Sequence, residues 1–223
     1  MQTFHYKAAI WDMDGTLLNT LEDIAGGLNQ TLRSWGLPEH SPCETLDGIG
    51  HGSKYLCQWG SGLSGEELDR FTTEYRYNTI HLKDPKTQPY PGICALLKEL
   101  KDKHFRLGIY TNKPQNWTEQ LTDRFFGLNQ FDQIIGTRPD GYLKPDPGGI
   151  LEMCSLWQIS PGETLMIGDS EVDWQTAVNA GCTGICVSWG FGNKQKLESL
   201  GVSMIDNIVA LRAAILCDNT QRI

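Results

Sequence analysis

The sequence contains no long apolar segment. No apolar run approaches the roughly 18 residues that a membrane-spanning helix requires. Residues 1–12 lack the apolar stretch and the small-residue cleavage site that are typical of a signal peptide. We therefore expect no membrane partner and a location in the cytoplasm.

Positive charge and paired cysteines are also scarce. The chain has 19 Lys and Arg against 27 Asp and Glu, which gives a net charge of −8. Such an acidic protein is not expected to bind nucleic acid, although a local site could still attract a small anion. The seven cysteines are odd in number and form no CxxC motif, which favours reduced thiols over a disulfide framework.

From about residue 89 onward the chain alternates between helical and strand patterns. The full length of 223 residues allows one large domain or one domain with an insert. Apolar runs and apolar periodicity predict strands over 6–11, 105–110, 133–136, 164–167 and 185–187, and helices that begin near 93, 114, 150, 171 and 208. This alternation favours an α/β fold with a parallel sheet that helices cover on both faces.

The stretch between the first strand and residue 89 has a different pattern. Helical spacing of apolar residues predicts helices over 21–35 and 66–82, although Gly26 and Gly27 weaken the first of them. No convincing strand occurs in this stretch. We predict a core formed by residues 1–17 and 89–223, with a helical insert over 18–88 between them.

Two carboxylates follow the first predicted strand, in the motif DMDGT. Asp12 and Asp14 are two positions apart, so they point to the same side of an extended chain. Ligands of an open parallel sheet bind beyond the carboxyl ends of its strands, which makes both residues candidates for chemistry. An Asp-Gly turn held by local hydrogen bonds explains this motif equally well.

Three further motifs follow later strands. Thr111 and Asn112 precede a predicted helix, where they could bind phosphate or simply cap the helix. Lys144 lies in a KPDP turn, where it could neutralise phosphate charge or be solvated. Asp169 and Asp173 are one helical turn apart and could face one point, although acidic residues also stabilise the first turn of a helix.

In a parallel sheet all four motifs lie along one edge. Four carboxylates would then face one prominent cation, Lys144, and would repel one another in a low dielectric. A ligand set of oxygens without a His or Cys cluster favours a hard cation, Mg²⁺ before Zn²⁺. Mg²⁺ beside Thr, Asn and Lys side chains indicates chemistry on a phosphoryl group.

These motifs, in this order, resemble the haloacid dehalogenase superfamily of phosphatases, and within it the phosphoglycolate phosphatase group. The resemblance is carried by DMDGTL at 12–17, TNKP at 111–114, KPDP at 144–147 and GDSEVD at 168–173. It implies a Rossmann-like parallel sheet core with a helical cap inserted after the first strand. Trp11 stands where the family usually has Phe.

The resemblance also implies a role for each acidic residue. Asp12 would be the nucleophile and would form an aspartyl-phosphate. Asp14 would be the general acid and base, and its main-chain carbonyl would bind Mg²⁺. Asp12 and Asp169 would complete the metal ligands, and Asp173 would support the metal site through water or hydrogen bonds.

Thr111, Asn112 and Lys144 would bind the phosphoryl group. The resemblance thus predicts a Mg²⁺-dependent phosphatase, monomeric or homodimeric, that hydrolyses a small phosphorylated metabolite, with 2-phosphoglycolate as the first candidate. In such enzymes the cap selects the substrate. His51, Lys54 and Arg33 are the cap residues that we consider as selectors.

Three other functions remain open from the sequence. A sugar phosphomutase of the β-phosphoglucomutase type shares all four motifs, but the family mutases carry a His early in the first cap helix and residues 20–31 contain none. A pyrophosphatase or nucleotidase of the same superfamily is the second alternative. The third is a binding or signalling module that only accepts phosphate on Asp12.

Overall fold

The structure of the protein is a computed structural model that describes residues 5–127 and 129–216. Its centre is a six-stranded sheet in the order β5-β4-β1-β6-β7-β8, and all neighbouring strands are parallel. The strands are β1 (Ala8–Trp11), β4 (Arg106–Pro114), β5 (Gln133–Thr137), β6 (Thr164–Gly168), β7 (Thr183–Val187) and β8 (Met204–Ile205). The predicted parallel α/β fold is confirmed.

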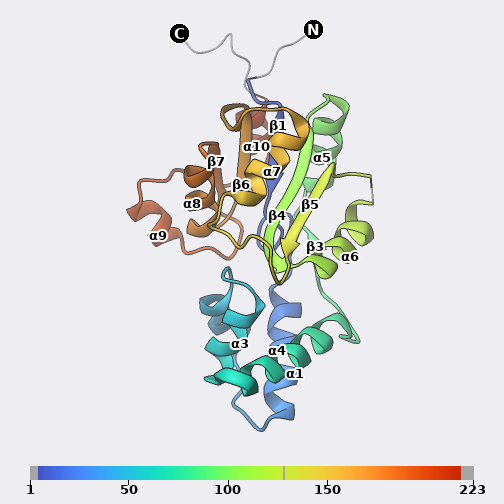
Figure 1. Ribbon diagram of the computed structural model, residues 1–223, viewed down its shortest axis with the longest axis vertical. Helices are drawn as coiled ribbons and strands as arrows, with labels where there is room; N and C mark the ends of the chain where they lie inside the picture. The colour runs from blue at the N-terminus through green and yellow to red at the C-terminus, as the bar shows by residue number, and fades with distance from the viewer. Residues whose placement is uncertain (1–4, 128, 217–223) are drawn as a thin grey trace.

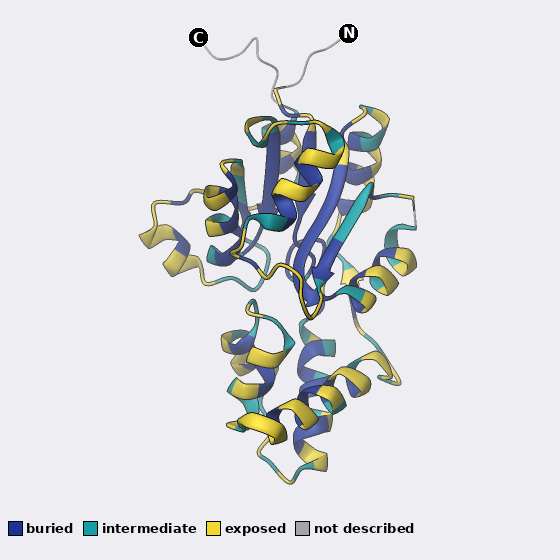
Figure 2. Ribbon diagram, in the orientation of Figure 1, coloured by how far each residue is buried: buried dark blue, intermediate teal, exposed yellow. Residues whose placement is uncertain are grey.

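Helices cover both faces of this sheet (Figure 1). The central strands β1, β4 and β6 are almost wholly buried, whereas β5, β7 and β8 are partly exposed (Figure 2). Successive side chains of a strand point to opposite faces, so Trp11 packs on one face and Ile10 on the other. The Trp11 face is covered by α5 (Ile93–Asp102), α6 (Gln115–Phe126) and α10 (Ile208–Ile215), and the Ile10 face by α7 (Gly148–Trp157) and α8 (Glu171–Ala180).

A second group of helices lies between β1 and β4 in the chain. It comprises α1 (Leu21–Ser34), α2 (Pro42–Thr45), the 3₁₀ turn η1 (Leu46–Gly48), α3 (Ser53–Ser61) and α4 (Gly65–Ile80). These helices share a hydrophobic cluster of their own and lie beyond one end of the strands (Figure 1). In the part of the chain that the structure describes, no helix has both the length and the apolar character to cross a membrane.

Gly27 lies inside α1 although glycine has a poor helix propensity, and its contact with α4 explains why. A Cβ atom at Gly27 would lie only 2.0 Å from Thr79 Oγ1 of α4. The missing side chain therefore lets α1 and α4 pack closely, and this tertiary contact offsets the weak local preference.

Several elements differ from the sequence-based prediction. The chain enters and leaves the helical group through a short antiparallel pair, β2 (Leu18–Asn19) with β3 (Gln88–Pro89), which no apolar pattern indicated. Helix α3, helix α9 (Lys194–Ser199) and strand β8 were not predicted either. Two-residue strands contain too few side chains to show a period, and α3 and α9 bury only two residues and one residue, so their detection needs the partner segment.

Candidate active site

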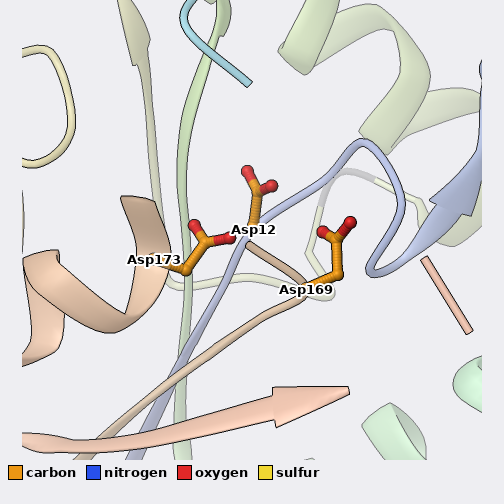
Figure 3. A group of neighbouring side chains, drawn as sticks. All are labelled: Asp12, Asp169 and Asp173. Carbon is orange, nitrogen blue, oxygen red and sulfur yellow. The ribbon is translucent and has the colours of Figure 1, made fainter. Parts of the chain in front are cut away.

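Two acidic residues lie side by side because the strands before them are paired. Trp11 of β1 is in register with Ile167 of β6, and Asp12 N–H donates to the Ile167 carbonyl over 2.8 Å. Asp12 and Asp169 therefore extend from the carboxyl ends of adjacent parallel strands. Figure 3 shows them beside Asp173 of α8, and one carboxylate oxygen of each lies within 4.8 Å of the others.

All three residues are buried, and burial disfavours the charged forms of Asp12 and Asp169. Burial raises the pKa of Asp12 to about 6, with further contributions from Asp173 and Asp14 and an opposing one from Lys144. Burial raises the pKa of Asp169 to about 7, and the nearby charges of Asp173 and Asp12 raise it further. Ionisation of Asp12 and Asp169 is therefore unfavourable unless positive charge is placed next to them.

Lys144 supplies one such charge. The residue is 4% exposed, and its ammonium lies 2.8 Å from Asp12 Oδ1 and donates a hydrogen bond to Asp173 Oδ1. Burial alone would lower the pKa of Lys144, but the two carboxylates outweigh it and raise the pKa above its usual range. Lys144 is therefore a buried cation held between two of the three acidic residues.

Asp169 is fixed by donors from two loops. Its Oδ1 accepts from Thr16 Oγ1 at 2.8 Å, and its Oδ2 accepts from the N–H groups of Phe191 and Gly192 at 2.7 and 3.0 Å. Gly15 has φ +82°, and a Cβ atom there would lie 2.5 Å from Asp169 Oδ2. The glycine after Asp14 is thus required by both the backbone conformation and the close approach of this carboxylate.

Both carboxylate oxygens of Asp173 accept hydrogen bonds. Its Oδ1 contacts Lys144, and its Oδ2 accepts from the N–H and the hydroxyl of Ser170 at 3.1 and 2.6 Å. Ser170 and Asp173 form a capping box that begins α8. Both interpretations of Asp173 from the sequence therefore apply, since it caps a helix and also belongs to the acidic cluster.

Asp14 lies beside a second buried cation, Lys113, to which the sequence assigned no role. Lys113 Nζ lies 2.9 and 3.1 Å from the two carboxylate oxygens of Asp14. Thr20 Oγ1, just before α1, donates to Asp14 Oδ1 at 2.8 Å. β4 is irregular between Tyr110 and Pro114, and within this stretch Lys113 N–H donates to Thr111 Oγ1 at 3.3 Å.

Asn112 does not offer a free side chain to a phosphate. Its Oδ1 accepts from Lys144 N–H at 2.7 Å, and its Nδ2 donates to the carbonyls of Lys144 and Gly50 at 3.1 and 3.0 Å. These contacts use both amide hydrogens and the carbonyl of Asn112. The Asn112 side chain therefore ties the Lys144 segment and the loop at Gly50 to β4.

The acidic cluster meets the requirements of a hard divalent cation. Lys144 approaches Asp12 Oδ1 off the direction of a hydrogen bond, so among the described residues this buried oxygen has no hydrogen-bond donor. Asp12, Asp14 and Asp169 supply only oxygen atoms, which suits Mg²⁺ and not Zn²⁺ with its preference for nitrogen and sulfur. Of the acidic residues, Asp12 and Asp169 have the carboxylates that the cation would neutralise.

A cleft of about 500 Å³ opens above these residues. Asp12, Asp14 and Lys144 line it from the sheet side, and the helical group contributes His51 and Tyr55, whose rings are 4.8 Å apart. The other two cap residues singled out from the sequence are not part of this lining. Arg33 pairs with Glu39 and Lys54 pairs with Asp69, all on exposed surface.

The donors that hold the acidic residues were not predicted from the sequence. These donors lie within or next to the motifs, or after strand β7. They are Thr16, Thr20, Lys113 and the main-chain N–H groups of Phe191 and Gly192. Their position at or beyond the carboxyl ends of strands was the available signal, because such positions converge on one edge of a parallel sheet. Their partners depend on the course of the loops.

Comparison with known proteins finds a matching family and similar proteins whose names agree with it. The family model for haloacid dehalogenase-like hydrolases matches residues 9–187. The chain is 31% identical to a phosphoglycolate phosphatase of Aquifex aeolicus, over 83% of this chain and 86% of that protein. It is 32% identical to one of Nitrosospira multiformis, over 89% and 90%. A solved candidate phosphoglycolate phosphatase of Lactobacillus delbrueckii subsp. bulgaricus has a TM-score of 0.87 at 28% identity, with 98% and 100% coverage.

Proposed function

Because the chain belongs to the haloacid dehalogenase-like hydrolase family and is a phosphatase of phosphoric monoesters, we propose that it hydrolyses a small phosphorylated metabolite, with 2-phosphoglycolate as the first candidate. The observation that carries the proposal is the buried cluster of Asp12, Asp169 and Asp173 against Lys144 at the sheet edge. The substrate assignment is supported by the names of relatives that are 31% and 32% identical.

In this proposal a carboxylate oxygen of Asp12 attacks phosphorus. The P–O bond to the leaving group breaks, and the phosphoryl group is transferred to Asp12, where it forms an acyl phosphate. A carboxylate that approaches a phosphate dianion meets strong repulsion, which Lys144 at 2.8 Å reduces. The hydroxyl of Thr111 and the main-chain N–H of Asn112 hold the transferred group, since the Asn112 amide is already bound to Lys144 and Gly50.

Asp14 moves the proton in both halves of the reaction. It first gives a proton to the leaving oxygen, so that an alcohol departs instead of an alkoxide. It then takes a proton from the water that attacks phosphorus and releases inorganic phosphate from Asp12. Asp14 is suited to this because it follows Asp12 by two residues and its side chain lines the same cleft.

Mg²⁺ would be held by the carboxylates of Asp12 and Asp169 and the main-chain carbonyl of Asp14, and when bound it would neutralise charge on the phosphoryl oxygens. The donors from Thr16, Phe191 and Gly192 fix the orientation of Asp169 for this role. Asp173 supports the site indirectly, because its oxygens are bound to Lys144 and Ser170.

We predict that Mg²⁺ stabilises the protein against heat more strongly at pH 8 than at pH 5.5. Asp12 and Asp169 have pKa values raised to about 6 and about 7, above their ordinary value. The folded state therefore binds protons more tightly than the unfolded state, and these groups cost stability as the pH rises towards 8. A bound cation offsets this cost. At pH 8, with Mg²⁺ at 100 times its Kd at that pH, we expect the unfolding midpoint to rise by roughly 5–10 °C. The same Mg²⁺ concentration should give a smaller rise at pH 5.5.

The measurement is thermal unfolding followed by circular dichroism, with and without MgCl₂, at both pH values. Asp169→Asn removes one ligand and one charge, so its Mg²⁺-dependent shift should be small at both pH values. Ca²⁺ and K⁺ serve as controls for size and charge. An equal Mg²⁺ shift in wild type and Asp169→Asn would remove Asp169 from the metal site.

The proposed activity is tested by the release of inorganic phosphate. The panel contains 2-phosphoglycolate, sugar phosphates, nucleotides, pyrophosphate and p-nitrophenyl phosphate, each with and without Mg²⁺. We expect Mg²⁺-dependent release, with the highest kcat/KM for 2-phosphoglycolate. A preference for another panel member would overturn the substrate but not the phosphatase chemistry, and no release from any of them would favour a phosphate-accepting binding module.

We propose that residues 18–88 act as a cap on a core of residues 1–17 and 89–223, and that the cap selects the substrate. Support comes from the separate hydrophobic cluster of helices α1, α3 and α4 and from the position of His51 and Tyr55 in the cleft. We also propose a cytoplasmic monomer or homodimer. Sedimentation equilibrium of the purified protein distinguishes the two oligomeric states.

We predict that His51→Ala changes the ranking of substrates across the panel. The His51 side chain lines the cleft from the cap and can contact what is attached to the phosphate. Arg33→Ala and Lys54→Ala are matched controls from the same cap, since each pairs on exposed surface with Glu39 or Asp69. We expect at least a tenfold change in relative kcat/KM for His51→Ala, the size of about 1.4 kcal/mol, and none for the controls. An unchanged ranking in His51→Ala would exclude His51 as a selector.

A further inference from the structure

Lys113 is a buried ammonium whose nearest acidic partner is the side chain of Asp14. Its side chain is 6% exposed and that of Asp14 is 16% exposed. The ammonium lies 2.9 Å from Oδ1 and 3.1 Å from Oδ2 of Asp14, so it contacts both oxygens of one carboxylate. Thr20 donates to Oδ1 alone. A donor that reaches both oxygens restrains rotation of the carboxylate plane, whereas a donor to one oxygen leaves that rotation open.

The other side of the Lys113 ammonium faces an aromatic ring. Lys113 Nζ lies 5.5 Å from the ring centroid of Trp117, within the range of a cation–π contact. Trp117 follows Lys113 by four residues and lies in the first turn of α6. Lys113 is thus held between an anion and the face of an indole ring, and its side chain is shielded from solvent.

Trp117 connects this arrangement to the cap. Although α6 packs on the sheet, the Trp117 side chain is buried in the hydrophobic cluster of α1, α3 and α4. Its ring lies 6.0 Å from the ring of Tyr75 on α4. A continuous chain of contacts therefore runs from the cap through Tyr75, Trp117 and Lys113 to the Asp14 carboxylate.

We propose that Lys113 is a positioning residue for Asp14, and that Trp117 makes this positioning depend on the packed cap. The proposal rests on the proposed function, in which Asp14 transfers the proton. A carboxyl group gives its proton efficiently only when one of its oxygens is aimed at the leaving oxygen. Lys113 and Thr20 together fix which oxygen faces the cleft. The competing role is binding of a second anionic group of the substrate, since Lys113 also lines the cleft.

The test compares Lys113→Met on an alkyl and an aryl phosphate. Met keeps the length and apolar stem of Lys and removes the ammonium. We expect kcat on 2-phosphoglycolate to fall about 10- to 100-fold, a part of the usual contribution of general acid catalysis. On p-nitrophenyl phosphate, whose phenolate leaves without a proton, kcat should fall less than about threefold. KM should stay within about threefold on both substrates.

A double variant separates positioning of Asp14 from other roles of Lys113. If Lys113 acts through Asp14, adding Lys113→Met to Asp14→Asn should cause no further loss. Trp117→Leu should show a smaller loss with the same preference for the alkyl ester. Lys196→Met is the matched control, because Lys196 lines the same cleft but pairs with Glu171, and its effect should not depend on the leaving group.

Three results would overturn the proposal. These are equal losses on both esters, a raised KM with unchanged kcat, and additive losses in the double variant. If Lys113→Met does not fold by circular dichroism, Lys113→Gln is measured in its place. Asp14→Asn alone tests the proposed function. If kcat on the alkyl ester falls selectively in Asp14→Asn but not in Lys113→Met, only the positioning role is refuted. If kcat does not fall in Asp14→Asn, the function of Asp14 itself is refuted.

Discussion

Asp12→Asn is expected to abolish turnover on every phosphate ester. The variant keeps the shape of the side chain but has no carboxylate oxygen to attack phosphorus, so neither alkyl nor aryl esters can form the acyl phosphate. We expect kcat to fall by at least about 10⁴-fold, the scale of the loss when a nucleophile is removed. The measurement is phosphate release from 2-phosphoglycolate and p-nitrophenyl phosphate under saturating Mg²⁺.

Protein stability provides the control for this variant. Burial and neighbouring carboxylates raise the pKa of Asp12 to about 6, so its charged form is unfavourable in the folded state. A neutral Asn should therefore leave the unfolding midpoint at pH 8 equal to or above that of wild type, while Lys144 keeps its contact with Asp173. Retained turnover in a folded Asp12→Asn variant would show that another group is the nucleophile.

Asp14→Asn is expected to lower turnover in a way that depends on the leaving group. An amide keeps the contact with Thr20 but cannot donate and then accept a proton in the reaction. We expect kcat on 2-phosphoglycolate to fall about 10²- to 10⁴-fold, the usual contribution of general acid and base catalysis. The loss on p-nitrophenyl phosphate should be smaller if the first step limits, because nitrophenolate departs without a proton.

The comparison with Asp12→Asn makes this result specific. Both variants are measured on the same two esters, and only Asp14→Asn should discriminate between them. Its unfolding midpoint is followed as well, because Lys113 loses the carboxylate with which it pairs. Near wild-type turnover of the alkyl ester by Asp14→Asn would exclude Asp14 as the acid and base.

Local sequence pattern determined the class of fold and the edge of the sheet at which the candidate site residues gather. Runs of apolar residues followed by Asp12, Thr111 and Asp169 predicted these side chains beyond strand ends. This holds for Asp12 and Asp169, whereas β4 continues through Thr111 to Pro114. The parallel registers of β1 with β4 and β6 confirm that these strands are neighbours. The reason is geometric: every strand of a parallel sheet ends at the same edge, so side chains that follow the strands converge there whatever the order of the strands.

The tertiary structure alone decided which groups pair across that edge. The contact of Lys113 with Asp14 joins residues 99 positions apart, and the loop at Phe191 reaches Asp169 from 22 positions away. Only the fold shows that Arg33 and Lys54 lie outside the cleft while His51 lines it. Periodicity reports the side of an element on which a residue lies, whereas its partner depends on strand order and loop course, and these are set by the packing of the whole chain.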